Sequence, residues 1–279
     1  MRTLKLTIAY DGTAYAGWQL QPGKPTVQGM LEHALKKITG RRAPTLASGR
    51  TDAGVHALGQ VVGVRTDCPL PPETLLKAIN AHLPRDIAVL DAADAPEGFH
   101  PIRDVLRKRY RYVIHDGPVR DVFCRHRAWH YVHGRLDVEA MRRAAAPLVG
   151  RHDFQSFQSS GAPRKTTVRT VFELSIQRGR AAECAIHATS SQRDHAAALS
   201  MFPDSFILLD IEADGFLYNM VRTIVGTLVQ VGRGAKSDGW PREALEAADR
   251  RRAGPTAPPQ GLFLVQVDYA QTASVESNP

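Results

Sequence analysis

The stretch TVQGMLEHALKKITG, residues 26–40, decides how the first half of the chain folds. Its apolar residues recur at helical spacing, and they are Met30, Leu31, Ala34, Leu35 and Ile38. Thr26 is a residue type that accepts hydrogen bonds from the first turn of a helix. Gly40 is the type that ends a helix, because glycine adopts the left-handed conformation without strain. The pattern therefore predicts a helix over residues 27–39.

Strand patterns lie on both sides of this helix. Period-two alternation predicts a strand at residues 4–10 before it, and two further strands at 42–47 and 60–66 after it. A second helix is expected to begin near Pro72, and a fourth strand is expected at residues 87–93. The resulting order, β-α-β-β-α-β, is that of a ferredoxin-like unit.

The second half shows the same order of patterns. We expect its main elements at residues 107–114 (strand), 137–149 (helix), 167–177 (strand), 206–213 (strand), 216–231 (helix), 241–252 (short helix) and 262–268 (strand). The sequence thus predicts an α+β protein of two ferredoxin-like (βαββαβ) domains, residues 1–104 and 105–279. We interpret a polar, aperiodic stretch near 178–205 as a surface insertion.

The composition narrows the class of protein. The 279 residues are 43% hydrophobic and 23% charged, which is typical of a soluble globular protein. No apolar run is long enough to span a membrane, and the N-terminus lacks the apolar core of a signal peptide, so we expect a cytoplasmic protein with no membrane partner. Cys68, Cys124 and Cys184 lie too far apart to form a disulfide framework or a paired metal site. The net charge of +8 favours an anionic partner such as nucleic acid.

The segment RKRYRYVI, residues 107–114, alternates in character along a predicted strand. One face carries Lys108, Tyr110, Tyr112 and Ile114, and the other carries Arg107, Arg109, Arg111 and Val113. Aromatic rings can stack on unpaired bases while arginines hold phosphates. The alternative is a half-buried strand with its tyrosines in the core and its arginines in solvent. The segment alone leaves both interpretations open.

The loop SGRTDAGVHALGQ, residues 48–60, places an acid and a base among glycines. Gly49 and Gly54 permit close backbone approach, so Asp52 could meet a ribose or a base edge while Arg50 or another arginine keeps it ionised. The alternative is an ordinary turn in which Asp52 caps backbone amides. Arg222, beside the apolar stripe of the helix expected at 216–231, could likewise point into a cleft or lie at the margin of the core.

The string GRTDAGVHALGQ closely resembles the active-site motif of the TruA family of tRNA pseudouridine synthases. Other strings resemble further signatures of that family, in the same order along the chain. They are YDGTAYAGWQLQ (10–21), TVQGMLEHAL (26–35), FHPIRDVLRKRYRY (99–112), HDFQSF (152–157), GFLYNMVRTIVGTLVQVG (215–232) and APPQGLFLVQVDY (257–269). The resemblance therefore covers nearly the whole chain.

This resemblance implies isomerisation of uridine to pseudouridine at positions thirty-eight to forty of the tRNA anticodon stem-loop, with no metal or organic cofactor. Asp52 matches the catalytic aspartate, which could attack C1′ as a nucleophile or remove the C2′ proton as a base. Arg222 matches its ion-pair partner. Tyr110 matches a tyrosine that stacks on the uracil and could accept the C5 proton. Arg50 resembles the residue that fills the gap left by a flipped nucleotide.

The resemblance also implies an arrangement of the halves. Their antiparallel sheets would join into one central mixed sheet with helices on one side, and the catalytic cleft would lie between the halves. Members of the family act as homodimers on tRNA. The arginines that could then hold the tRNA backbone are Arg107, Arg109, Arg111, Arg125 and Arg127. The stretch 178–205 departs from the family pattern by its length.

Two other classes of function compete with this one. A metal-dependent nuclease or hydrolase would use Asp52 and His56 with the cluster His126, His130 and His133, but one carboxylate with scattered histidines lacks the usual ligand set. A non-catalytic RNA-binding module is the second class. No stretch matches the RNP1 pattern, and an inactive relative would be expected to have lost the aspartate that this chain keeps.

Overall fold

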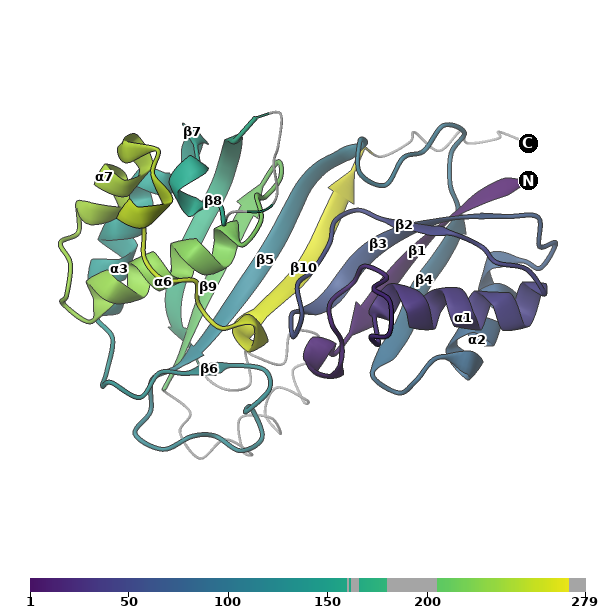
Figure 1. The fold of residues 1–279 in the computed structure, drawn as a ribbon, viewed down its shortest axis with the longest axis horizontal. Coiled ribbons are helices and arrows are strands. Elements are labelled where there is room, and N and C mark those ends of the chain that lie inside the picture. The colour runs from purple at the N-terminus through teal and green to yellow at the C-terminus, as the bar shows by residue number, and fades with distance from the viewer. Residues whose placement is uncertain (160, 162–165, 180–204, 271–279) are drawn as a thin grey trace, which may run out of the picture. The chain divides into compact units, whose positions relative to one another are not determined.

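The computed structural model describes residues 1–159, 161, 166–179 and 205–270 (Figure 1). The chain divides into two compact units. Unit 1 is Met1–Lys108 together with the residues from Val265 onward, and unit 2 is Arg109–Leu264. The sequence placed the division after residue 104 and kept the last strand in the second domain. The insertion expected near 178–205 lies outside the described residues, apart from its two ends.

Unit 1 has the predicted order of strands and helices. Its elements are β1 (Arg2–Tyr10), α1 (Val27–Thr39), β2 (Thr45–Ala47), β3 (His56–Thr66), α2 (Pro72–His82) and β4 (Ile87–Asp94), with the start of β5 (Val105–His115) and the end of β10 (Leu262–Tyr269). β1 lies between β4 and β3 and is antiparallel to both, and β2 pairs with β3. The predicted βαββαβ order of this half is confirmed.

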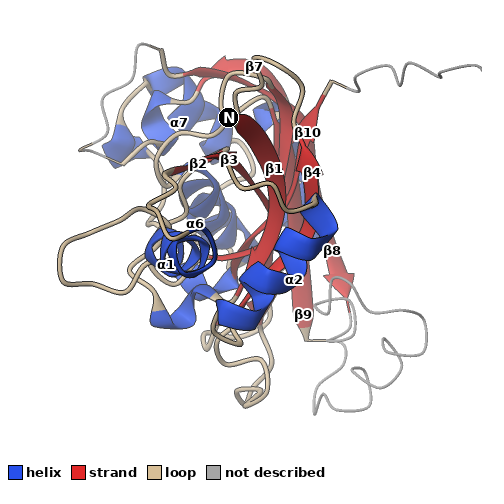
Figure 2. Cartoon of the chain, turned by 90° about the vertical axis from the view of Figure 1, so that its right-hand side faces the viewer, coloured by secondary structure: helices blue, strands red, loops and turns tan. Residues whose placement is uncertain are grey.

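The core of unit 1 follows from the periodicities of its elements. Along β1, Leu4, Leu6 and Ile8 are fully buried, while the residues between them are partly exposed. α1 starts and ends where its caps predict, because Thr26 Oγ1 accepts from the Gly29 amide at 3.2 Å and Gly40 adopts φ +70°. α1 and α2 pack side by side, as Figure 2 also shows with α1 viewed almost along its axis.

β3 begins earlier than its pattern predicts. The strand was expected from residue 60, yet the structure starts it at His56. The reason is pairing with β1. Ile8 pairs with Gln60, and after a shift in register Tyr10 pairs with Ala57, so β3 extends back beyond its own alternating pattern. The extension brings the start of β3 directly to the end of the 48–55 loop.

Unit 2 contains the same order, β5-α3-β8-β9-α6-β10, with additional elements. Its elements are the rest of β5, β6 (Trp129–His130), α3 (Val138–Ala145), β7 (Gly150–Asp153), β8 (Val168–Gly179), β9 (Phe206–Ala213), α6 (Met220–Gly232), α7 (Trp240–Ala247) and the start of β10. Within this unit the strands follow the order β5-β9-β8-β7. β9 is antiparallel to β8, whereas β6 is parallel to β5. The α+β class is confirmed.

α6 shows where local periodicity was insufficient. The apolar stripe predicted a start near residue 216, but the helix begins at Met220 because Asn219 adopts a left-handed conformation, φ +60°, that a helix cannot include. The stripe itself is buried as expected. At Gly226 an added Cβ would lie 1.7 Å from the Pro255 carbonyl oxygen, so the 254–257 segment passes directly over the helix.

The helices of the described ranges are short. The longest, α1 and α6, have 13 residues each. Across residues 1–159, 161, 166–179 and 205–270, no helix is both long and apolar enough to cross a membrane.

Candidate active site

The loop that carries Asp52 lies in unit 1, between β2 and β3, and its backbone is held by the segment that follows β1. The Thr51 carbonyl accepts a hydrogen bond from the Trp18 amide at 3.0 Å. The hydroxyl groups of Tyr10 and Thr51 share a buried hydrogen bond of 2.8 Å. Asp52 itself is half-buried. Thr51, which directly precedes Asp52 in the chain, is thus fixed by both its carbonyl and its side chain.

Two glycines allow this segment to lie against the loop. A Cβ added to Gly12 would lie 2.0 Å from the Val55 carbonyl oxygen, and one added to Gly17 would lie 2.6 Å from the Thr51 carbonyl oxygen. Real Cβ atoms essentially never lie closer than 3.0 Å to another atom, so a side chain at either place would force the backbone to shift. Within the loop, Gly54 adopts φ +76° and the Val55 amide donates to the Asp52 carbonyl at 3.1 Å. Asp52 therefore lies on a tight turn whose position is set by its contacts with the segment that follows β1.

The start of the loop has its own anchors. The side-chain amide of Gln60, a fully buried residue of β3, donates to the Gly49 carbonyl at 2.7 Å, and its carbonyl oxygen accepts from the Ser48 hydroxyl. Lys108 Nζ donates to the Ser48 carbonyl at 2.7 Å. Lys108, which the alternation placed on the aromatic face of its strand, therefore holds the backbone of the loop.

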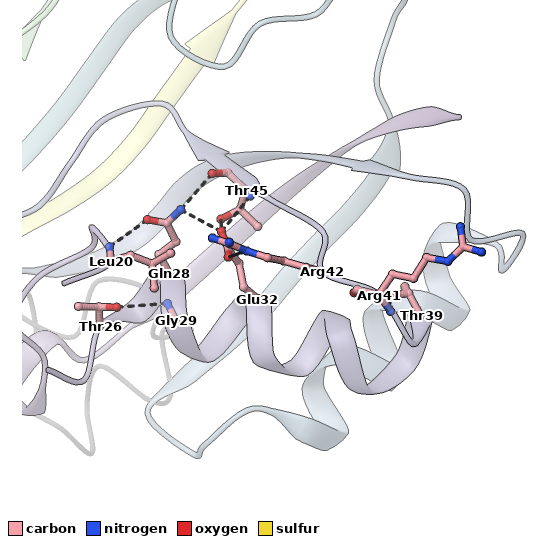
Figure 3. Close-up of polar contacts among 9 residues, drawn as sticks. All are labelled: Leu20, Thr26, Gln28, Gly29, Glu32, Thr39, Arg41, Arg42 and Thr45. Atoms are coloured by element: carbon pink, nitrogen blue, oxygen red, sulfur yellow. Dashed lines mark hydrogen bonds and ion pairs between the residues drawn. The ribbon is translucent and has the colours of Figure 1, made fainter. Parts of the chain in front are cut away.

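A buried polar network ties α1 to β2, which leads into this loop (Figure 3). Glu32 Oε1 accepts from the Thr45 amide at 3.1 Å and from the Gln28 side chain at 3.0 Å. Gln28 also donates to the Thr45 carbonyl and accepts from the Leu20 amide. Arg42 Nε lies 3.4 Å from Glu32 Oε2. The network fixes the strand from which the Asp52 loop departs.

The end of the loop meets a buried histidine. His56 Nδ1 lies 3.1 Å from the Gly12 amide nitrogen and 3.2 Å from Asp11 Oδ1. The hydrogen bond with His56 is the main reason that the pKa of Asp11 falls well below its ordinary value, and hydrogen bonds from Thr13 add to the effect. The sequence analysis named His56 only in the metal alternative and did not single out Asp11. The signals that could have found them here are the strings that contain them, YDGTAYAGWQLQ for Asp11 and GRTDAGVHALGQ for His56.

Tyr110 and Tyr112 lie in the part of β5 that belongs to unit 2. Both are buried, and the Tyr110 ring meets Phe216 edge to face with 5.0 Å between centroids. The Tyr112 hydroxyl donates to the Pro258 carbonyl at 2.6 Å, and burial raises its pKa well above the usual range. The placement of tyrosines in the core is therefore confirmed for these two rings. The stacking of Tyr110 on a base stays a prediction.

Arg109 and Arg111 form ion pairs with the neighbouring strand β9. Arg109 Nη2 lies 2.8 Å from Glu212 Oε2, and Arg111 binds Asp210 through two nitrogens at 2.7 Å each. The carboxylates neutralise these guanidinium groups within unit 2. The contact of these two arginines with tRNA phosphates stays a prediction.

Arg222 extends from the first turn of α6 and is held by neutral acceptors. Its Nε donates to the Ala257 carbonyl at 2.7 Å, and its Nη1 donates to Asn219 Oδ1 at 2.8 Å. Asn219 is itself fixed, because its amide donates to the Ser159 hydroxyl at 3.0 Å. These two contacts fix the orientation of the guanidinium.

The four residues predicted for the site fall into two pairs. Asp52 and the exposed Arg50 lie in unit 1, whereas Tyr110 and Arg222 lie in unit 2. The ion pair between Asp52 and Arg222 and the cleft between the halves stay predictions.

The metal alternative finds no ligand set in the described part of the chain. Across residues 1–159, 161, 166–179 and 205–270, no group of three or more His, Cys, Asp or Glu side chains could hold a metal ion. His130 Nε2 instead contacts the Gly117 carbonyl at 3.0 Å, and His133 packs edge to face on Tyr131.

Comparison with protein-family models identifies one match. A model described as tRNA pseudouridine synthase matches residues 6–103 and 144–270, which together make up well over half of the chain. The first segment includes Asp52, and the second includes Arg222.

Curated relatives match almost from end to end, and all three described here are named tRNA pseudouridine synthase A. The relative from Moorella thermoacetica is 44% identical over 271 residues, covering 96% of this chain and 100% of its own. That from Citrifermentans bemidjiense is 42% identical and covers 97% of this chain and 99% of its own. That from Thermoanaerobacter sp. (strain X514) is 40% identical and covers 96% and 100%.

A solved structure titled "Crystal Structure of a Cbf5-Nop10-Gar1 Complex" covers 81% of this chain and 54% of that chain. Its TM-score of 0.31 and sequence identity of 10% are too low to support a statement about this chain.

Proposed function

Because the chain belongs to the tRNA pseudouridine synthase family, we propose that it isomerises uridine to pseudouridine in tRNA. The observation that carries the proposal is the loop of Asp52, whose string resembles the family's active-site motif and whose backbone is fixed at both ends. The same resemblance extends the proposal to positions thirty-eight to forty of the anticodon stem-loop. It also supports a homodimer in the cytoplasm.

The reaction assigns Asp52 the central step. The N1–C1′ bond of uridine must break, the uracil must turn, and a new bond must form between C5 and C1′, after which the C5 proton is lost. An ionised Asp52 would either attack C1′ or remove the C2′ proton, and both routes remain in the proposal. Contacts with the segment that follows β1 fix the position of the Asp52 turn. A fixed position suits either route, because the carboxylate must approach one atom of the ribose closely.

The other three residues have supporting roles. Arg222 would pair with Asp52 and keep it ionised when the substrate displaces water. Tyr110 would stack on the detached uracil and could accept the C5 proton. Arg50 would occupy the gap in the RNA when the target nucleotide flips out, a step that costs a few kcal/mol. Its exposed position suits a residue that meets RNA before the reaction begins.

Tritium release tests this proposal directly, since isomerisation leaves the mass unchanged. Transfer RNA labelled with tritium at C5 of uridine is incubated with wild-type protein and with Asp52→Asn, both in EDTA. Release by wild type alone, with equal tRNA binding by both proteins, supports the proposal and places Asp52 in the chemical step. If the well-folded wild type binds tRNA but releases no tritium, the isomerase is excluded and the RNA-binding module takes its place.

A further inference from the structure

His56 is the first residue of β3 and directly follows the loop of Asp52, yet it lies in the interior of unit 1. Its side chain is 2% exposed. The Nδ1 atom meets two groups of the segment after β1, namely the Gly12 amide at 3.1 Å and Asp11 Oδ1 at 3.2 Å. A side chain next to the loop is thus joined to the segment that packs on the loop.

The proton on Nδ1 decides which of these contacts is a hydrogen bond. Without that proton, Nδ1 accepts from the Gly12 amide; with it, Nδ1 donates to the Asp11 carboxylate. Both forms bind the same two-residue turn to the start of β3. Asp11 is held in turn, because its Oδ1 accepts from the Thr13 amide at 3.0 Å and its amide donates to the Asp86 carbonyl at 2.9 Å.

The turn formed by Asp11 and Gly12 lies directly against the loop of Asp52. Gly12 packs on the Val55 carbonyl so closely that a Cβ would lie 2.0 Å from its oxygen, and the Val55 amide binds the Asp52 carbonyl. Any movement of Gly12 away from His56 would therefore loosen the support under Val55. The chain of contacts runs from Asp11 and His56 through Gly12 and Val55 to Asp52.

We propose that His56 and Asp11 are positioning residues for the isomerisation, acting through the Nδ1 atom of His56 to hold the Gly12 turn against the loop of Asp52. The inference rests on the proposed function and adds two residues to it. Neither residue needs to touch the tRNA. Their effect falls on the rate of the chemical step, because a displacement of a reacting group by about 1 Å costs about 100-fold in rate.

Two substitutions of similar polarity separate the role of Nδ1 from that of the imidazole ring. In His56→Asn the side-chain amide takes the place of Nδ1, whereas in His56→Gln it reaches the place of Nε2. At saturating tRNA we expect His56→Gln to slow tritium release by about 10- to 100-fold. We expect His56→Asn to keep most of the wild-type rate. Asp11→Asn removes the charge but keeps an acceptor for the Thr13 amide, so we expect its loss of rate to be intermediate.

Binding and folding are measured alongside the rate. The expected result is an unchanged dissociation constant for tRNA and melting temperatures that do not separate the Asn and Gln variants. Equal rates for the two His56 variants, whether both high or both low, overturn the inference. A loss of rate in the two His56 variants that follows their loss of melting temperature also overturns it. If the wild type releases no tritium, the proposed function fails and the inference fails with it. If the wild type releases tritium but the two His56 variants release it at equal rates, the inference fails and the proposed function stands.

Discussion

Gly12→Ala is the sharpest test of the idea that the 10–18 segment sets the position of Asp52, the proposed catalytic carboxylate. The new Cβ would lie 2.0 Å from the Val55 carbonyl oxygen, whereas ordinary contacts begin at 3.4 Å. The separation must therefore increase by about 1.4 Å, the difference between these two distances. The clashing atom belongs to the backbone, so no side-chain rotation relieves it. Because the Val55 amide binds the Asp52 carbonyl, the shift is passed to Asp52.

The expected effect is large on rate and moderate on stability. Misplacement of a reacting group by about 1 Å costs about 100-fold in kcat. Overpacking of this kind destabilises a protein by about 1–3 kcal/mol, which leaves a domain of this size folded. The assay is tritium release from labelled tRNA at saturating concentration, with the thermal melt and the affinity for tRNA measured on the same preparation.

Gly239→Ala is the matched control. The nearest atoms to its new Cβ lie 3.9 and 4.0 Å away, and the backbone is helical with φ −77° and ψ −18°, so alanine fits without movement. We expect this variant to equal the wild type in rate and in melting temperature. If Gly12→Ala is folded and keeps its rate to within about threefold, a change too small for a 1 Å displacement, the positioning argument is refuted.

Three further outcomes are expected. Glu32→Ala removes the buried acceptor of the Thr45 amide and should lower the free energy of unfolding by about 1–3 kcal/mol for each polar group left unsatisfied, measured by urea denaturation; an unchanged midpoint would contradict this. Gly226→Ala places a Cβ 1.7 Å from the Pro255 carbonyl oxygen, so displacement of the segment that binds Arg222 should reduce both kcat and melting temperature, and a wild-type kcat would speak against it. The pKa of Asp11 is lowered from 3.8 in the folded state, so its ionised form stabilises the fold above that pH and the benefit is lost as the pH falls through the folded pKa. The melting temperature of Asp11→Asn should thus lie below that of the wild type at neutral pH, and the gap should narrow in acid; a gap that widens would contradict this.

Local features were enough to predict much of the fold. α1 begins after Thr26 and ends before Gly40, as its caps and apolar spacing predict, because capping and periodicity act within a few residues of the chain. The order of elements in unit 1 follows for the same reason. Strings of adjacent residues also carried the resemblance to the family, which the comparisons confirm.

The sequence by itself thus determined the order of the main helices and strands and the family to which the chain belongs. Only the tertiary structure decided that Arg109 pairs with Glu212, that Lys108 holds the Ser48 carbonyl, and that Gly12 packs on Val55. Each of these contacts joins residues far apart in the chain. Their existence depends on strand register and on the packing of distant segments, which no local pattern of residue types specifies.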